Sequence, residues 1–174
     1  MNTVANDSKR EHSIVARIDR QVARFENGLG ILLVITVTVV VLLQITFRFF
    51  LNSPLSWSGE LATYILVWLT FLGLAIAQRD KAHVALHILP DLNGVAEQAV
   101  NWLRWIAGVV LFAVMGGGGL ALAFMHNVES SPAMGLPIWA VYLGLPLGGV
   151  LGLWHLMLDL PGLIRGDKEE QRWH

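Results

Sequence analysis

Histidines are the residues of this sequence that could bind a metal ion or a haem, and there are six of them. His83 and His87 are spaced i, i+4, which would place two imidazoles on one face of a helix and permit metal ligation. No carboxylate or third histidine is placed to complete the ligand set. His126 and His155 fall at opposite ends of their apolar segments, so they could not flank one haem. We therefore expect no cofactor in this chain.

Nucleophilic chemistry is also poorly supported by the sequence. Cysteine is absent, which excludes disulfides, thiolate metal sites and thiol catalysis. Serines cluster in the short connections between apolar segments, at Ser53, Ser56, Ser58, Ser130 and Ser131. No histidine is placed beside them as a general base, and Ser56 or Ser58 is expected instead to cap the helix that follows. The sequence predicts a protein that is not an enzyme.

The elements that carry these residues are strongly apolar. Of the 174 residues, 55% are hydrophobic and only 14% are charged, whereas soluble domains carry about 25% charged residues. This composition excludes a soluble enzyme and a disordered chain. The net charge of −1 gives no basic excess that would point to nucleic acid. The sequence therefore predicts an integral membrane protein.

Four apolar runs are long enough to cross the hydrocarbon core, which takes about 20 residues per helix. The predicted spans cover residues 29–47, 61–77, 104–125 and 137–158, with tails at 1–28 and 159–174. This pattern predicts an all-α fold in which 1–174 form a single membrane domain. The first run starts too late and is too long for a cleavable signal peptide, so we expect it to remain as an anchor.

The positions of the basic residues predict the orientation in the membrane. Of the 12 lysines and arginines, all but Arg48 lie in the two tails or around the connection between the second and third spans. Both termini and that connection are therefore expected on the cytoplasmic side. In the first tail, Ile14, Ile18, Val22 and Phe25 repeat at helical spacing. This pattern permits either an interfacial amphipathic helix on anionic lipid or a simple extension of the first span.

An ionisable residue inside a span usually marks a substrate path, a proton relay or an ion site. The hydrocarbon portions of the four predicted spans contain no Asp, Glu, Lys or Arg. Arg104, Asp159 and Glu60 lie only at the ends of spans, where their side chains can reach the membrane surface. We therefore expect that this chain does not move a charged solute alone.

Small residues on the fourth span provide a surface for close helix packing. Gly144, Gly148 and Gly152 recur every four residues, and such spacing lets backbones approach closely in lipid. The contact could be internal to the bundle or made with another protein. Pro146 should bend the same span, because its ring displaces the carbonyl of Tyr142.

A series of short motifs surrounds the second span. In chain order they are Arg48, Asn52-x-Pro54, Trp57-x-x-Glu60, Phe71-Leu-Gly73 and Arg79-x-x-x-His83. Together with four spans, this order resembles the small membrane subunit (DctQ-like) of tripartite ATP-independent periplasmic (TRAP) transporters. The resemblance is closest over residues 44–89, and the third and fourth spans match in layout only. Family members often continue after the histidine with a basic residue and an aspartate, whereas this chain has Ala85 and His87.

The resemblance implies partners and a role. A periplasmic substrate-binding protein (DctP-like) would deliver an organic-acid-like solute to a membrane pair in the bacterial inner membrane. The large subunit (DctM-like) would hold the substrate and sodium sites of this symport and move by an elevator mechanism. This chain would then be a multi-pass, non-catalytic subunit that enlarges the stationary scaffold, in contact with membrane lipids and without a cofactor of its own.

Five residues follow as candidates for structural and partner contacts. Arg48, Trp57 and Glu60 would form the docking core of the outer face, with Arg48 pairing with Glu60. Arg79 and His83 would hold the inner connection against the large subunit. Two other functions remain open from the residues alone: a haem-binding anchor of a redox complex, and a standalone homo-oligomeric exporter.

Overall fold

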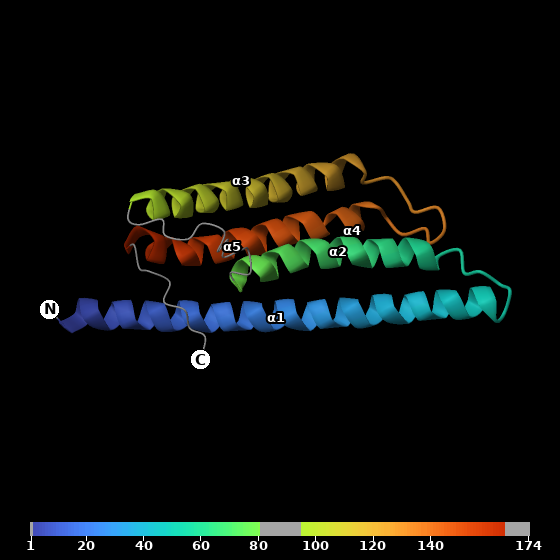
Figure 1. The fold of residues 1–174 in the computed structure, drawn as a ribbon, viewed down its shortest axis with the longest axis horizontal. Helices are drawn as coiled ribbons and strands as arrows, with labels where there is room; N and C mark the ends of the chain where they lie inside the picture. The colour runs from blue at the N-terminus through green and yellow to red at the C-terminus, as the bar shows by residue number, and fades with distance from the viewer. Residues whose placement is uncertain (1, 81–94, 166–174) are drawn as a thin grey trace.

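The computed structural model describes residues 2–80 and 95–165, and this part of the chain is helical (Figure 1). Its helices are α1 (Asn2–Phe49), α2 (Ser58–Arg79), α3 (Val95–Met125), α4 (Trp139–Tyr142) and α5 (Gly144–Arg165). The predictions made for His83, His87 and the last nine residues lie outside the described residues.

Four stretches are long and apolar enough to cross a membrane: Arg17–Phe49, Ser58–Arg79, Gln98–Met125 and Trp139–Pro161. The prediction of an all-α protein with four membrane-spanning helices is therefore confirmed, and the chain is a multi-pass membrane protein. The agreement has a simple physical reason. A segment that crosses lipid must satisfy its backbone hydrogen bonds internally, which favours a helix, and it must expose apolar side chains, which the sequence shows directly.

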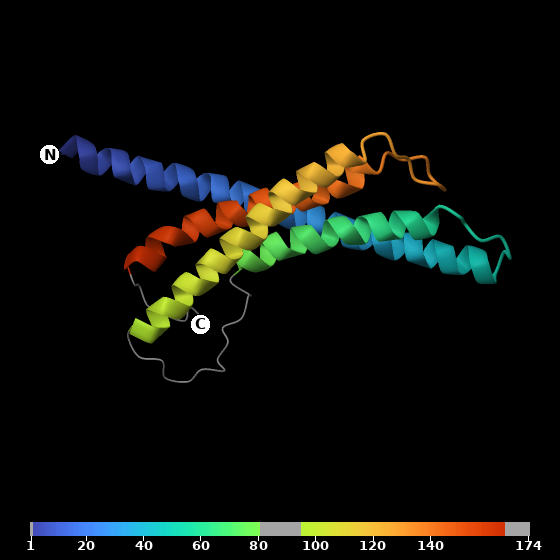
Figure 2. The ribbon, with the colours of Figure 1, turned by 90° about the horizontal axis from the view of Figure 1, so that it is seen from above.

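The first helix is much longer than a membrane span. With 48 residues and a rise of 1.5 Å per residue, α1 is about 72 Å long, compared with a hydrocarbon core of about 30 Å. Its N-terminal part extends beyond the other helices in both ribbon views (Figures 1 and 2). Residues 2–28 thus continue the first span as one helix, and no separate interfacial helix precedes it.

Helix α5 lies at the centre of the bundle, between α2 and α3, whereas the backbone of α1 comes close to α2 alone among the described helices. The buried core joins α3 to α5 through Phe112, Met115 and Leu156. We name the two ends of the bundle by what meets there. At the terminal end, α1 near Glu26 meets the last turn of α2 and the second half of α5. The loop end carries the connections 50–57 and 126–138.

The glycines of α5 lie against neighbouring helices within the chain. A Cβ atom at Gly148 would stand 2.5 Å from the carbonyl oxygen of Phe71 on α2. A Cβ atom at Gly152 would overlap the ring of Phe112 on α3, and one at Gly144 would lie 3.4 Å from Trp68. All three glycines therefore face helices of the same chain, which was one of the two possibilities that the sequence left open, and Gly148 and Gly152 leave no room for a side chain.

The fourth span is interrupted where Pro146 requires it. The helical hydrogen-bond pattern is interrupted at Leu143, between α4 and α5, although the backbone dihedral angles of Leu143 stay helical. Proline cannot donate the backbone hydrogen bond that would reach back to Tyr142. Trp68 supports this break from α2, because its indole Nε1 donates a hydrogen bond to the carbonyl oxygen of Ala140 at 3.2 Å. This explains how a tryptophan can lie deep within the second span.

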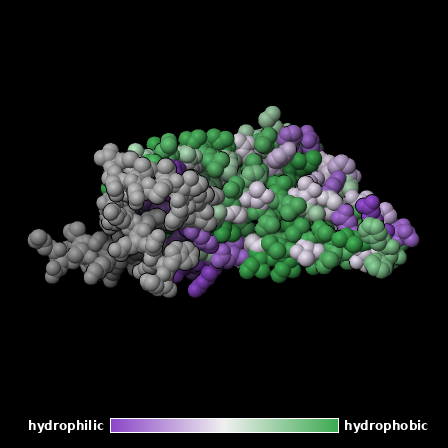
Figure 3. All heavy atoms as spheres, viewed as in Figure 1, coloured by the Kyte–Doolittle hydropathy of each residue, from purple (hydrophilic) through white to green (hydrophobic). Residues whose placement is uncertain are grey.

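The surface of the molecule has the layers expected of a membrane protein. Green, apolar atoms cover most of the middle of the face shown in Figure 3, and purple atoms gather at the tip formed by the loop end and beside the grey atoms. Large apolar side chains such as Ile31, Val114 and Phe124 are exposed along α1 and α3. Burial inside the bundle is modest because these side chains face lipid.

Candidate functional site

The terminal end of the bundle is held by a buried ion pair between α1 and α2. Glu26 lies on α1 with no exposed surface, and its Oε2 is 2.8 Å from Nη1 of Arg79, the last residue of α2. Arg79 also donates hydrogen bonds to the carbonyl oxygen of Ala23 at 3.3 Å and to Oδ1 of Asn27 at 2.9 Å. One guanidinium thus binds a full turn of α1, as its planar fork of donors allows.

A histidine brings the third helix to the same carboxylate. His155 of α5 is only 3% exposed, and its Nε2 lies 2.9 Å from Oε1 of Glu26. Its other ring nitrogen, Nδ1, lies 3.7 Å from Oδ1 of Asp19, which precedes Glu26 by about two turns of α1. A polar cavity of about 80 Å³ lies beside these groups and reaches Asp159. We call Asp19, Glu26, Arg79 and His155 the terminal cluster.

The terminal cluster ties together helices whose backbones do not all touch. Glu26 uses both carboxylate oxygens, one for the arginine and one for the imidazole. A buried carboxylate is costly to desolvate and is tolerated when its oxygens are satisfied in this way. The Glu26–His155 contact therefore connects α1 to α5, although the apolar part of α1 lies along α2.

Sequence reasoning singled out Arg79 and weighed His155 only as a haem ligand, and it missed Glu26 and Asp19. The structure brings Arg79 against α1 of the same chain, in addition to any contact it makes with a partner. The sequence did contain a signal that these residues could meet, because successive spans run in opposite directions through the membrane. A residue at the start of the first span, one at the end of the second and one near the end of the fourth lie at the same depth, where opposite charges would meet.

At the loop end, Glu60 binds the connection between α3 and α4. Its Oε2 accepts a hydrogen bond from the Ser131 hydroxyl, and both carboxylate oxygens lie 3.2 Å from the backbone nitrogen of Ala133. The Ser131 oxygen in turn accepts a hydrogen bond from the backbone N–H of Met134 at 3.1 Å. The carboxylate at the first turn of α2 thereby orders a loop more than 70 residues further along the chain.

The ordered loop has a compact backbone. The Ser131 N–H donates to the carbonyl oxygen of Leu136 at 2.8 Å, and Ser130 and Pro137 form an antiparallel bridge. Gly135 has a φ of 66°, a left-handed conformation that favours glycine. Ser131 is 3% exposed, whereas its neighbour Ser130 is exposed. The loop therefore has a fixed shape that depends on Glu60.

Arg48 and Glu60 do not pair in the structure, in contrast to the pairing suggested by their charges. Arg48 is exposed, and its guanidinium lies 5.6 Å from the centroid of the Phe49 ring. Trp57 is half-buried at the start of α2, where its carbonyl oxygen accepts a hydrogen bond from the N–H of Leu61 at 3.0 Å. No side chain caps this helix, and the Ser58 hydroxyl donates to the Leu55 carbonyl oxygen instead.

His126 and His155 lie at opposite ends of the bundle and do not share a site. His126 stacks on Tyr142 with ring centroids 5.2 Å apart, and its Nδ1 lies 3.0 Å from Glu129 at the loop end. His155 belongs to the terminal cluster. Across residues 2–80 and 95–165, no group of three or more histidine and carboxylate side chains is arranged to bind a metal ion.

Comparison with known families matches most of the chain. Residues 37–166 match the model of the DctQ component of tripartite ATP-independent periplasmic transporters. The match extends from the second half of the first span to the end of α5, so it covers the third and fourth spans as well as the motif region around the second.

Individual relatives agree with the family model. The ectoine TRAP transporter small permease protein TeaB of Halomonas elongata is 26% identical over 161 residues, which are 88% of this chain and 82% of TeaB. The C4-dicarboxylate TRAP transporter small permease protein DctQ of Rhodobacter capsulatus is 30% identical over 100 residues, 56% of this chain and 44% of the relative.

A third relative is much longer than this chain. The isethionate TRAP transporter permease protein DctMQ of Oleidesulfovibrio alaskensis is 29% identical over 112 residues, but these make up only 18% of its length. These relatives favour a transporter subunit over a haem-carrying anchor and over a standalone exporter. With its four membrane-spanning helices and a family match over residues 37–166, the chain belongs to the DctQ family of small permease subunits of TRAP transporters.

Proposed function

We propose that this chain is a non-catalytic brace within a TRAP uptake transporter and that it supports the large membrane subunit during solute import. The observation that carries this proposal is the terminal cluster, in which Glu26 joins Arg79 and His155. The ionisable groups at this depth are engaged in holding α1, α2 and α5 together, as suits a body that stays still while another subunit moves.

The glycine contacts of α5 support the same role. Gly148 and Gly152 bring α5 so close to α2 and α3 that even a methyl group would not fit. Tightly packed helices resist relative sliding because any shift would create overlap. An elevator-type partner needs such a rigid surface, since its transport domain must move against something that does not follow it.

The partners are a large DctM-like membrane subunit and a periplasmic DctP-like binding protein. The long relative named DctMQ supports the first, because the part similar to this chain is a small fraction of that protein. The permease protein SiaT of Haemophilus influenzae is a second case, with 34% identity over 73 residues that make up 12% of its length. The solute would be an organic-acid-like compound, and the sodium sites would lie in the large subunit.

The positive-inside distribution of lysine and arginine supports an orientation in the bacterial inner membrane. The terminal end, with Arg17, Arg20 and Arg24 on α1, would face the cytoplasm. The loop end, with the connection that Glu60 orders, would face the periplasm, where the binding protein delivers its solute. Arg48 and Trp57 remain predicted contact residues for a partner on the periplasmic side, and Arg79 remains a predicted contact residue on the cytoplasmic side.

Reconstitution tests the proposed function. Proteoliposomes that hold this chain with its large subunit should take up solute when the binding protein and a sodium gradient are supplied. Vesicles that hold this chain alone should show no uptake under the same conditions. Solute uptake by this chain alone, or unchanged uptake by the large subunit without it, would contradict the proposal.

A further inference from the structure

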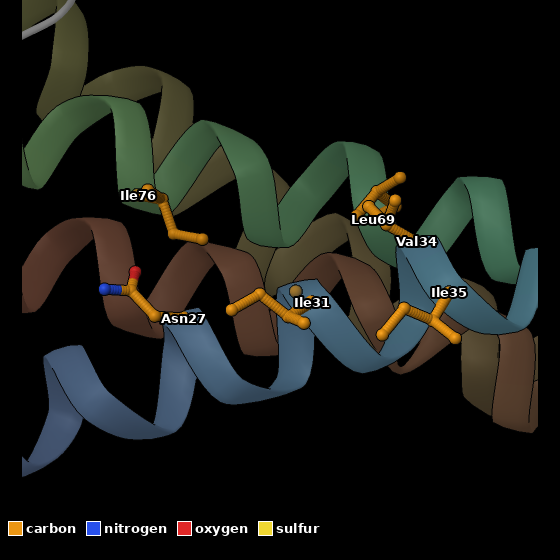
Figure 4. A pocket seen from close by; sticks show the side chains of 7 residues that line it. Asn27, Ile31, Val34, Ile35, Leu69 and Ile76 are labelled. Atoms are coloured by element: carbon orange, nitrogen blue, oxygen red, sulfur yellow. The ribbon is translucent and has the colours of Figure 1, made fainter.

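An apolar groove runs along the surface between α1 and α2 (Figure 4). Its volume is about 450 Å³, and it is lined on α1 by residues between Asn27 and Ile35 and on α2 by Leu69 and Ile76. We call it the α1–α2 groove. Ile31 and Ile76 extend from the two facing helices along its length in Figure 4. The groove belongs to neither the terminal cluster nor the loop end.

A glycine forms the floor of the groove. Gly30 has no side chain to fill the space in front of α2, and a Cβ atom placed there would lie 3.7 Å from Cδ1 of Ile76 and 3.9 Å from Cδ2 of Leu72. These are ordinary van der Waals distances, so a Cβ atom fits at this position, and a side chain built from it would start in contact with the α2 wall of the groove. By contrast, Gly28 is exposed, and nothing lies within 4 Å of a Cβ atom built there.

The length of the groove is close to the thickness of the hydrocarbon layer in one leaflet. Asn27 and Ile35 are eight residues apart, or about 12 Å along a helix, and one leaflet contributes about 15 Å of hydrocarbon. The polar end of the groove is Asn27, whose side chain accepts the hydrogen bond from Arg79. The other end is apolar, with Ile31 and Ile35 more than half exposed.

Two arginines continue the line of the groove beyond its polar end. Residues 20, 24, 27, 31 and 35 follow one another at intervals of three or four, so they share one face of α1. Arg20 and Arg24 are both exposed on this face. Two cations next to an apolar slot at the membrane boundary complement the charge and shape of an anionic phospholipid.

We propose that the α1–α2 groove holds an acyl chain of an anionic phospholipid whose phosphate lies at Arg20 and Arg24. The lipid would fill the space left by Gly30 and would become a structural component between the two helices. This inference requires that the chain spans the membrane, but it does not depend on the transport role. Its failure would therefore leave the proposed function unaffected.

Photocrosslinking in nanodiscs tests the proposal. The full chain is placed in a bilayer of phosphatidylcholine with a trace of phosphatidylglycerol that carries a photoactivatable acyl chain, and adducts are mapped by mass spectrometry. We expect adducts to concentrate on α1 between residues 30 and 35 and on the facing part of α2. An even distribution around α1, with Val39 on another face labelled in similar yield, would mean surrounding bulk lipid and would overturn the proposal.

Gly30→Leu is the variant that fills the groove, and Gly28→Leu is its matched control on the same helix. Gly30→Leu should lower the groove adducts several-fold while Gly28→Leu leaves them unchanged, with both variants checked for wild-type elution and helicity. Equal yields in the two variants would contradict the proposal. The mapping is then repeated with the large subunit present, because the groove could instead be filled by that protein. A crosslink to the large subunit that replaces the lipid adduct would also overturn the proposal.

The arginines provide a second measurement that leaves the groove packing untouched. Unlabelled phosphatidylglycerol should compete for the groove adduct better than phosphatidylcholine does. The Arg20→Gln/Arg24→Gln variant should lose this preference, by about fivefold for each arginine. A preference that persists in the double variant would show that the two arginines do not hold the headgroup.

Discussion

Glu26 and His155 are 129 positions apart in the chain, and their Oε1 and Nε2 atoms lie 2.9 Å apart in a buried contact. The carboxylate is also paired with Arg79, so a single acidic side chain joins three helices. In lipid, apolar side chains give little preference for one helix neighbour over another, because lipid tails are as apolar as they are. A satisfied polar cluster therefore fixes which faces of α1, α2 and α5 meet.

Replacing Glu26 with glutamine should destabilise the bundle by about 1–3 kcal/mol, because His155 and Nη1 of Arg79 lose their charged partner at a buried site. The loss is not larger because Arg79 keeps its ion pair with Asp80 at 2.8 Å. The measurement is unfolding in mixed micelles as the fraction of denaturing detergent rises. Glu129→Gln is the matched control, since that carboxylate pairs with His126 at the surface and should cost less than about 1 kcal/mol. Coincident unfolding curves for the two variants would contradict the role assigned to Glu26.

Replacing Ser131 with alanine should loosen the connection between α3 and α4. The change removes the hydrogen bonds from Ser131 to Glu60 and from the Met134 N–H to Ser131, and each lost bond at a buried site costs about 1–3 kcal/mol. Hydrogen exchange measured by mass spectrometry should become faster over residues 131–136. Ser130→Ala changes an exposed neighbour, so equal acceleration in that variant would argue against the contact with Glu60.

Replacing Gly152 with alanine should destabilise the contact between α3 and α5, because the new methyl group would overlap the Phe112 ring. Overpacking of this kind costs about 1–3 kcal/mol. Gly117→Ala makes the same change on an exposed face of α3 where no atom lies within 4 Å, and it should be neutral or slightly stabilising. Thermal unfolding of the purified variants measures the difference, and the reverse order of stabilities would exclude this packing.

The orientation can be tested with single introduced cysteines, because the chain has none of its own. Val128 is 87% exposed at the loop end, and Arg17 is exposed on α1 beyond the terminal cluster. In intact spheroplasts, a maleimide that cannot cross the membrane should label Val128→Cys and should label Arg17→Cys only after permeabilisation. Labelling of Arg17→Cys in intact spheroplasts would reverse the proposed orientation.

The number and type of helices could be predicted from sequence because they depend on local quantities, namely the length and hydropathy of each apolar run. The approximate membrane depth of each residue also follows from its position within its apolar run. Pro146 marked the break at Leu143 for a similar local reason, since a missing N–H acts one turn away.

Helix rotation and loop conformation could not be read in the same way. Whether Glu26 faces α2 and α5 or faces away from them depends on how α1 is turned about its axis. Polar residues lie on more than one face of α1 in this region, for example Arg24 and Asn27 beside Glu26, so the pattern does not single out one face. Glu60 shows the second difficulty. Its opposite charge suggested Arg48, yet a hydroxyl and a backbone amide from the 126–138 connection reach the carboxylate instead.

The position of Glu26 along α1 has a mechanical consequence. The residue lies near the midpoint of a helix that runs unbroken from Asn2 to Phe49, and it is the point at which that helix is fastened to its neighbours by charge. The arm after Glu26 packs along α2 and is held there, whereas the arm before Glu26 extends beyond the other helices (Figures 1 and 2). The charged contacts of Glu26 therefore lie at the base of the projecting arm, where they resist any force applied to it.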